Sequence, residues 1–331
     1  MAYEITRESF TTLGEEWLQV LPQCATDSIF LTPRWQETWW QGMGSGELQL
    51  LRIGDDNHLL GIAPLASEGR RWRFLGDSSV FDYQDFIIPR GSEAPFFQAL
   101  GDYLEGEEWD VLDLPSLPEG SPTLHFLPLL AQGQGWGVAV EDEGVAPGIF
   151  LPGSWDEYLG GLTKKDRHEL RRKLRRLEGT TQYATRVVQA DQELPPAMDE
   201  FLSLMRTSRV DKQEFLTPDR ERFFKDIGQA LAQTGHLRLY FLQINGAHVA
   251  AALCFDYGGR RLLYNSGYDL SYSSLSVGLL LKALCLKDAI SAGMSYFDFL
   301  RGPEPYKYDL GGRDVRLYHL VITRHPGESP R

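Results

Sequence analysis

The sequence predicts an α/β (α+β) fold made of two related domains in tandem, and three features of the chain support this prediction. A strand–turn–strand pattern occurs once in each half, and an amphipathic helical segment follows each copy. A stretch rich in glycine separates the two halves. At 331 residues, 42% of them hydrophobic, the chain is long and apolar enough to form two packed cores.

The two strand–turn–strand patterns share the same spacing of landmarks. His58 opens an apolar run in the first half, and Arg70 follows twelve residues later, directly after a glycine. His248 and Arg260 repeat this spacing in the second half, again with a glycine before the arginine. Each copy is typical of a β-hairpin closed by a glycine turn. Duplication explains the match, and chance similarity between apolar strands is the alternative.

The segments that follow the two hairpins also correspond. Residues 109–119 resemble residues 296–304, and each is preceded by an amphipathic segment that predicts a helix, at 95–106 and 276–291. Ahead of the second copy, glycine and proline are dense up to residue 148, which is typical of a domain boundary. We therefore expect an N-terminal domain over residues 1–145 and a C-terminal domain over residues 146–331.

One short segment concentrates positive charge in an acidic chain. The formal net charge is −13, yet the thirteen residues from Lys164 to Arg176 contain eight Lys or Arg and two acidic residues. No lysine precedes Lys164. Such local charge favours one anionic partner, which could be a phosphate-bearing donor, an RNA or an anionic lipid. It excludes a long DNA duplex bound over the whole protein surface.

A basic helix is predicted over residues 164–178, after a capping-box pattern. Arg171 and Arg175 lie four residues apart beside a leucine face, and Arg172 is adjacent. Like charges at this spacing repel one another in an isolated helix. This pattern favours an anion-binding face that includes Arg171, Arg172 and Arg175, and a solvated charged face is the alternative.

Several classes of site and location are not expected. Three scattered cysteines in apolar surroundings predict reduced core thiols. No HExxH, CxxC, GxSxG or P-loop pattern occurs, so we expect no metal site. The start of the chain lacks the features of a secretory signal, and the most apolar helical run, 277–286, is too short to span a bilayer. These features predict a cytoplasmic protein without a transmembrane segment.

The segments 154–178, 265–293 and 297–312 together resemble the BioF2-like or CelD-like acetyltransferase family, which is similar to the Fem aminoacyltransferases. The segments 28–40 and 73–86 also resemble this group. The resemblance implies two tandem GNAT-like domains, each a mixed, mostly antiparallel sheet flanked by helices. It also implies a degenerate first domain on the acceptor side and a second domain, with the basic helix, on the donor side.

In GNAT enzymes a helix N-terminus receives the pyrophosphate of the acyl donor. By resemblance, the matching residues here are Ser273, Ser276, Val277 and Gly278, with Arg171, Arg172 and Arg175 as further phosphate ligands. Ser273 and Ser276 replace the Arg/Gln and the glycine of the usual R/Q-x-x-G-x-G/A pattern. This departure leaves two donors open, acyl-CoA and aminoacyl-tRNA. An ordinary serine N-cap is the alternative interpretation of these residues.

The segment 298–307 is predicted to form a rigid turn after a strand. By resemblance, Lys307 and Tyr306 form the aromatic–lysine pair of the active site, and Lys307 stabilises negative charge that develops on the donor. Asp298 is a candidate base or orienting carboxylate, and capping of the turn is its alternative role. Arg301 and Glu304 are candidate substrate-binding residues.

In the first half, Asp82 and Tyr83 resemble an acceptor-side feature of the family; a buried tyrosine with a hydroxyl partner is the alternative. Taken together, we expect an N-acyltransferase that moves an acyl group from acyl-CoA to an amine acceptor, with a cell-envelope saccharide precursor as the acceptor that the family implies. The alternatives are an aminoacyl-tRNA-dependent Fem-like transferase and a non-catalytic anion- or RNA-binding protein. The sequence does not indicate an oligomeric state.

Overall fold

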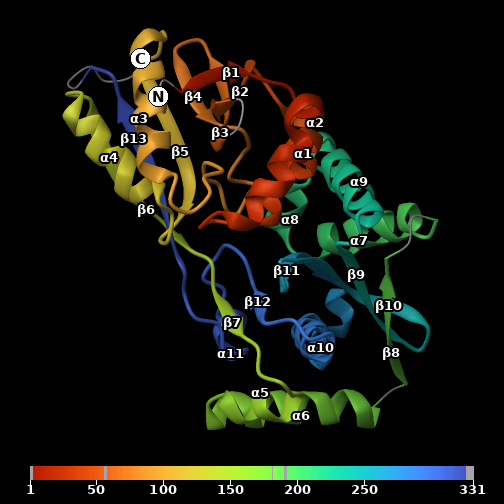
Figure 1. Ribbon diagram of the computed structural model, residues 1–331. Coiled ribbons are helices and arrows are strands. Elements are labelled where there is room, and N and C mark those ends of the chain that lie inside the picture. Colours follow the sequence, from red (N-terminus) through yellow and green to blue (C-terminus); the bar gives the residue numbers. More distant parts are fainter. Residues whose placement is uncertain (1–2, 56–57, 181, 190–191, 326–331) are drawn as a thin grey trace. The chain divides into compact units, whose positions relative to one another are not determined.

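The computed structural model describes residues 3–55, 58–180, 182–189 and 192–325 of the chain (Figure 1). The chain forms two compact units. The first consists of Met1–Val145 with Val315–Arg331, and the second of Ala146–Asp314. Each unit has its own sheet and its own hydrophobic core.

The first unit contains a seven-stranded sheet in the order β1-β2-β3-β4-β5-β13-β6. Strands β4 and β5 are parallel, and the other neighbouring pairs are antiparallel. The strands are β1 (Glu4–Arg7), β2 (Glu47–Gly54), β3 (Leu59–Glu68), β4 (Arg71–Phe74), β5 (Val111–Pro118), β6 (Gly137–Val145) and β13 (Arg316–Thr323).

Helices α3 (Glu93–Gly106) and α4 (Thr123–Gly133) pack on this sheet through an aromatic core that includes Phe86, Phe96 and Trp109. Helices α1 (Phe10–Val20) and α2 (Pro33–Met43) begin at side-chain caps, Ser9 and Thr32, which accept hydrogen bonds from first-turn amides.

The second unit contains a six-stranded sheet in the order β7-β12-β11-β10-β9-β8. Strands β11 and β12 are parallel, and the other pairs are antiparallel. The strands are β7 (Gly148–Phe150), β8 (Tyr183–Val188), β9 (Leu237–Ile244), β10 (Ala247–Tyr257), β11 (Arg260–Tyr268) and β12 (Tyr296–Asp298).

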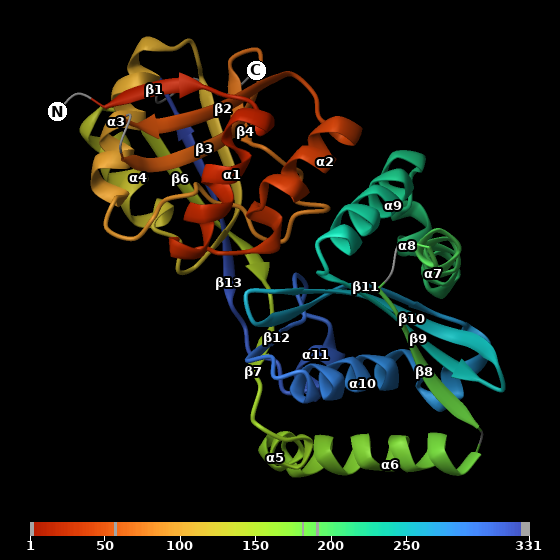
Figure 2. The same ribbon diagram turned by 45° about the vertical axis from the view of Figure 1, so that its right-hand side comes forward.

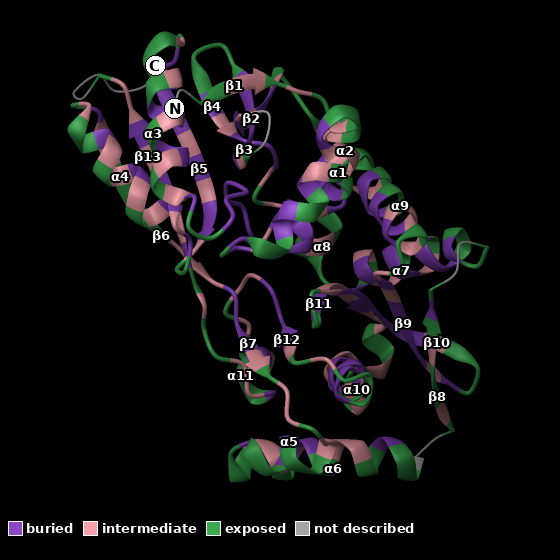
Figure 3. Ribbon diagram, viewed as in Figure 1, coloured by how far each residue is buried: buried purple, intermediate pink, exposed green. Residues whose placement is uncertain are grey.

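Helices cover both faces of this second sheet (Figure 2). Helix α10 (Val277–Ser291) lies on one face, with α5 (Trp155–Gly161) and α6 (Lys164–Thr180) packed against it. Helices α7 (Leu194–Ser208), α8 (Val210–Phe215) and α9 (Pro218–Gln233) lie on the other face, and α11 (Pro305–Asp309) follows β12. Figure 3 shows the contrast between the buried residues of α10 and the exposed outer surface of α6.

The predicted duplication is confirmed by the topology. In the first unit the hairpin β3–β4 is followed by α3 and then by β5, which is parallel to β4. In the second unit the hairpin β10–β11 is followed by α10 and then by β12, which is parallel to β11. The predicted helices at 95–106 and 276–291 correspond to α3 and α10. The fold class, two mixed and mostly antiparallel sheets flanked by helices, is also as predicted.

The end of the chain differs from the expected division into 1–145 and 146–331. Strand β13 returns to the first sheet, where it pairs with β5 on one side and with β6 on the other. The physical reason is that β5 and β6 are joined through α4 without pairing to each other, so a strand from elsewhere in the chain completes their hydrogen bonds.

Candidate functional site

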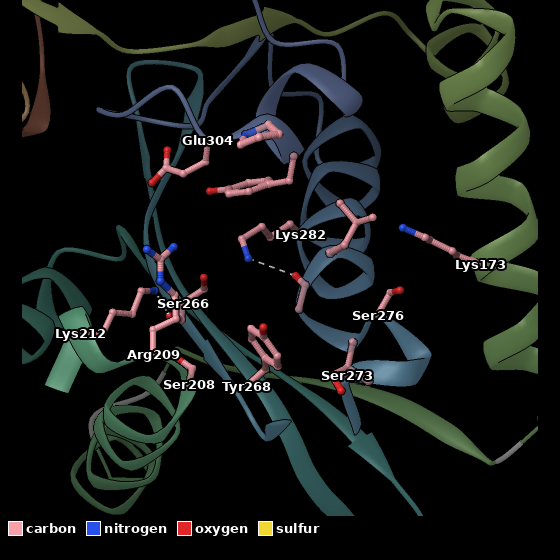
Figure 4. A pocket seen from close by; sticks show the side chains of 15 residues that line it. Lys173, Ser208, Arg209, Lys212, Ser266, Tyr268, Ser273, Ser276, Lys282 and Glu304 are labelled. Atoms are coloured by element: carbon pink, nitrogen blue, oxygen red, sulfur yellow. Dashed lines mark hydrogen bonds between the residues drawn. The ribbon is translucent and has the colours of Figure 1, made fainter. Parts of the chain in front are cut away.

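A pocket of about 480 Å³ opens in the second unit at the N-terminal end of α10 (Figure 4). Its wall is built by the start of α10 and the 3₁₀ helix before it (Leu270–Leu275), the end of β11, the junction of α7 and α8, the start of α11, and one side chain of α6. The lining residues are Lys173, Ser208, Arg209, Lys212, Ser266, Tyr268, Ser273, Ser276, Val277, Gly278, Leu279, Lys282, Glu304, Pro305 and Tyr306.

The first turn of α10 faces this pocket. Ser276 is the N-cap, and its side chain makes no capping hydrogen bond to the described residues. Val277, Gly278 and Leu279, whose amides have no partner within the helix, all line the pocket. Free amides and the positive end of the helix dipole attract an anion to such a position. The predicted donor-phosphate residues Ser273, Ser276, Val277 and Gly278 therefore lie together on one wall.

Ser276 adopts the backbone conformation that the usual glycine of the pattern would favour. Its φ is +57° and its ψ is +35°, which lies in the left-handed region. The departure from the usual glycine thus changes the side chain at this position and leaves the left-handed turn in place.

Gly278 is required by a close approach between α10 and β11. A Cβ atom added to Gly278 would lie 2.8 Å from Cδ1 of Tyr268, which is nearer than real side chains approach. The aromatic ring therefore sits directly against the first turn of the helix, beside the amides that open to the pocket.

Four of the lining side chains are cationic, and one, Glu304, is a carboxylate. Lys173 comes from α6 and lies on the side of the pocket opposite Arg209 and Lys212 (Figure 4). The predicted phosphate ligands Arg171, Arg172 and Arg175 are exposed and are not among the lining residues. The structure thus brings one residue of the basic helix to the pocket and leaves those three on the outer surface.

Lys282 occupies the middle of the pocket. Its Nζ donates a hydrogen bond to the Gly278 carbonyl, 3.2 Å away, and lies 4.6 Å from the centre of the Tyr306 ring. Burial lowers the pKa of Lys282 to about 8, because a charged ammonium loses its hydration there. The side chain is 7% exposed.

Lys212 enters from α8 and donates hydrogen bonds to Oδ1 of Asn265, at 2.9 Å, and to the Ser266 carbonyl. Burial is the largest cause that lowers its pKa to about 7, and the charge of Lys282 is the next. Both lysines were missed as site residues in the sequence. For Lys282 a signal existed, since it is the one charged residue in the apolar run 277–286; for Lys212 the sequence offers none.

The segment 298–307 forms a tightly bonded turn, as its glycine and prolines predict. Oδ1 of Asp298 accepts a hydrogen bond from the Leu300 amide at 2.8 Å. The Nζ of Lys307 donates to the carbonyls of Leu300 and Arg301, at 2.7 and 2.6 Å, and pairs with the Glu304 carboxylate at 2.9 Å. Both Asp298 and Lys307 are buried.

This turn presents Tyr306 and Glu304 to the pocket, whereas Asp298, Arg301 and Lys307 are not among the lining residues. Lys307 holds the carboxylate of Glu304 and the backbone of the turn, and Asp298 fixes the turn at its other end. The catalytic roles expected for Lys307 and Asp298 remain predictions. Burial raises the pKa of Tyr306, so its hydroxyl is neutral.

Asp82 and Tyr83 belong to the first unit. The Tyr83 side chain is buried, with its ring centre 6.1 Å from that of Phe30. The acceptor-side role of these two residues remains a prediction.

Residues 164–308, which include α6, α10 and every lining residue of the pocket, match the family model of the acetyltransferase (GNAT) domain. The second unit contains a GNAT domain. No curated protein matches the chain at the level of sequence.

Solved structures share the fold over nearly the whole chain. One is FemX, with a TM-score of 0.64, 13% identity and coverage of 95% of this chain and 96% of that one. A second is L-PGS from Bacillus licheniformis, with a TM-score of 0.54, 12% identity and coverage of 88% and 91%. A third is a tandem GNAT protein from the clavulanic acid biosynthesis pathway, with a TM-score of 0.52, 12% identity and coverage of 99% and 100%.

Residues 164–308 thus match a GNAT acetyltransferase domain, as expected, and the chain shares its fold with FemX and with a tandem GNAT protein. The assignment to the BioF2-like or CelD-like group remains a prediction. Within the described residues no cluster of side chains could hold a metal ion. Across the same part of the chain, no helix has both the length and the apolar character needed to cross a bilayer.

Proposed function

We propose that the protein is an N-acyltransferase that moves an acyl group from acyl-CoA to an amine, and that the GNAT domain binds the donor in the pocket at α10. The observation that carries this proposal is the first turn of α10, whose open amides line a pocket with four cationic side chains. A diphosphate would receive hydrogen bonds from the amides of Val277 and Gly278 and charge from Lys173.

Glu304 is the residue we propose to receive the acceptor amine. It is the one carboxylate among the lining side chains, and Lys307 fixes its position through a 2.9 Å ion pair. In the transfer step the amine nitrogen attacks the thioester carbonyl carbon, so that a C–N bond forms and the C–S bond breaks. The proton of the amine passes to Glu304, and the CoA thiolate leaves and takes a proton from water.

Under this proposal Lys307, Asp298 and Arg301 act mainly through the turn that they hold. Lys307 orients Glu304, and the alternative catalytic role for Lys307, direct stabilisation of the developing negative charge, requires its Nζ to turn toward the pocket. Tyr306 supplies one wall of the acceptor side. A cell-envelope saccharide precursor as acceptor, with Asp82 and Tyr83 as contacts, is proposed from the family resemblance.

A second candidate function, an aminoacyl-tRNA-dependent transferase, is supported by the exposed cations of α6. Six side chains on this helix carry positive charge at exposed positions, and one of them, Arg172, pairs with the carboxylate of Glu169. The phosphodiester backbone of a tRNA would gain binding free energy from such a row of cations. The six are Lys164, Lys165, Arg171, Arg172, Arg175 and Arg176.

The test is the release of free CoA thiol when acetyl-CoA or a long-chain acyl-CoA is mixed with a panel of amines that includes amino sugars. We expect Glu304→Gln to lower kcat by about 100-fold, the effect typical of losing a positioned base, with little change in the Kd of acetyl-CoA. Lys307→Ala is expected to lower kcat and to spare acetyl-CoA binding. Glu178→Gln, on the exposed end of α6, is the matched control.

The two donors are separated by the triple reversal Arg171→Glu, Arg172→Glu and Arg175→Glu. If acyl-CoA is the donor, this variant keeps its thiol release; if aminoacyl-tRNA is the donor, it loses tRNA binding and transfer. Binding of either molecule with no turnover by the unmodified chain would favour a non-catalytic binding protein and overturn the proposal.

A further inference from the structure

The pocket brings together three cationic side chains, of which Lys282 is buried, Lys212 is half-buried and Arg209 is exposed. Lys282 enters from α10, Lys212 from α8, and Arg209 from the residue between α7 and α8. Figure 4 shows Arg209 and Lys212 on the wall that faces α10, and Ser273, Ser276 and Lys173 at the other end of the pocket. Arg209 and Lys212 therefore lie apart from Ser273 and Ser276, and Lys282 lies between the two groups, with its Nζ bonded to the Gly278 carbonyl.

The hydrogen-bond partners of the two lysines are uncharged. Among the described residues, Lys282 donates to one backbone carbonyl, and Lys212 donates to an amide oxygen and to a backbone carbonyl. No described carboxylate forms an ion pair with either lysine. A buried ammonium without a counter-charge is costly, and proteins keep one where a ligand or a reaction needs it.

The nearby acidic groups are engaged elsewhere. Asp211 pairs with Nε of Arg209 at 2.9 Å, and Glu304 pairs with Lys307. The titratable and charged groups that face Lys212 or Lys282 are Arg209, Asp211, Cys254, Cys285, Glu304, Tyr306 and Lys307. Burial keeps the thiol of Cys285 and the hydroxyl of Tyr306 neutral, since it raises the pKa of both.

We propose that Lys212, Lys282 and Arg209 form a subsite for an anionic group of the substrate, a carboxylate or a phosphate, that is distinct from the phosphates of the donor. This inference rests on the proposed function and narrows its substrate class. The anionic group belongs either to the amine acceptor or to the far end of the transferred acyl chain. It supplies the counter-charge that both lysines lack and displaces water from their ammonium groups.

A rival role for the same lysines is that of a general base. With pKa values of about 7 and 8, either lysine is partly neutral near pH 7.5 and could accept a proton from the amine. The two roles predict opposite responses to pH. An anion subsite binds more weakly as pH rises because it needs the ammonium form, whereas a base works better as pH rises.

The first experiment measures binding without turnover. The full chain is titrated with succinate, with inorganic phosphate and with neutral succinamide, by calorimetry in buffers of different ionisation enthalpy. We expect succinate or phosphate, and not succinamide, to bind with uptake of protons at pH 8. Affinity should fall by up to about tenfold per pH unit above pH 8 for each proton taken up.

The variants Lys212→Met and Lys282→Met are expected to lose this proton uptake and at least tenfold in affinity. Exposed lysines provide the matched controls Lys225→Met, on α9, and Lys287→Met, on α10, which should bind as the unmodified chain does. Equal binding of succinamide, or unchanged affinity in both Lys212→Met and Lys282→Met, would overturn the subsite.

The second experiment identifies the source of the anion during turnover. Succinyl-CoA is compared with acetyl-CoA for the acyl chain, and glycine is compared with glycinamide for the acceptor. We expect at least a tenfold preference in kcat/KM for the anionic member of one pair, which falls to less than threefold in the Met variants. The same preference in the Met variants and the unmodified chain would overturn the subsite.

The two experiments separate this inference from the proposed function. Proton-linked succinate or phosphate binding without any acyl-CoA binding would contradict the transferase and support the subsite. Thiol release that rises with pH and is lost in Lys212→Met or Lys282→Met, without preference for an anionic substrate, would support the base and overturn the subsite.

Discussion

Replacing Lys282 by methionine should make the folded protein more stable at neutral pH. In the folded chain the pKa of Lys282 falls from 10.5, the value of an exposed lysine, to about 8. One pKa unit corresponds to about 1.4 kcal/mol, so keeping this ammonium charged costs about 3 kcal/mol of unfolding free energy at pH 7. Methionine has a similar length and no charge, and it removes this cost while it fills the same space.

The sign of the pH dependence follows from the same two pKa values. Between about pH 8 and pH 10.5 the unfolded chain binds more protons at this position than the folded chain does, so the unmodified protein gains stability as pH rises. Lys282→Met lacks this gain. The difference between the two proteins should therefore be largest below pH 8 and close to zero near pH 10.5.

The assay is urea unfolding followed by circular dichroism at pH 7, 9 and 10, together with hydrogen exchange of the α10 amides. The control is Lys287→Met on the exposed side of the same helix, which should change the free energy of unfolding by less than about 0.5 kcal/mol. A Lys282→Met protein that is less stable than the unmodified chain at pH 7 would contradict the destabilising effect of the Lys282 charge. A difference that does not depend on pH would refute it as well.

Three further predictions concern the architecture of the site and of the first sheet. Ser276→Gly should raise the free energy of unfolding by about 1 kcal/mol, because a left-handed conformation at φ +57° strains a serine and not a glycine. A lower melting temperature would contradict this. Gly278→Ala should weaken acetyl-CoA binding in calorimetry by at least tenfold, since its Cβ would press on Tyr268 beside the open amides, and an unchanged Kd would count against the proposed donor site. Deletion of residues 315–331 should abolish cooperative melting of the first unit, because β5 and β6 both lose their hydrogen-bonded neighbour; cooperative melting that persists would show that β13 is dispensable.

Much of the fold could be predicted because its signals are local. The glycine turns of the two hairpins and the helical periods of α3 and α10 depend on residues close in sequence. The start of α6 is another example, since Oγ1 of Thr163 accepts a hydrogen bond from the Asp166 amide at 3.2 Å, as the capping pattern predicts. The alternation of a strand does not say which sheet it joins, and β13 was therefore assigned to the wrong unit.

In the site, the positions of residues along the chain could be predicted, but the directions and burial of their side chains could not. The position of Lys307 in the turn could be predicted, but the direction of its Nζ depends on the carbonyls of Leu300 and Arg301, which a sequence pattern does not orient. Leu300 has a left-handed φ of +59°, which could not be predicted because leucine rarely adopts this conformation. The partial burial of Lys212 results from packing between α8 and β11, and Lys212 and its partner Asn265 lie more than fifty positions apart in the chain.

Calorimetric titration of the full chain with acetyl-CoA and with a long-chain acyl-CoA measures whether the pocket at α10 holds the phosphates of an acyl donor. We expect one molecule to bind per chain, with affinity lost in Gly278→Ala and retained in Lys287→Met. Absence of binding by both acyl-CoA molecules would contradict this expectation.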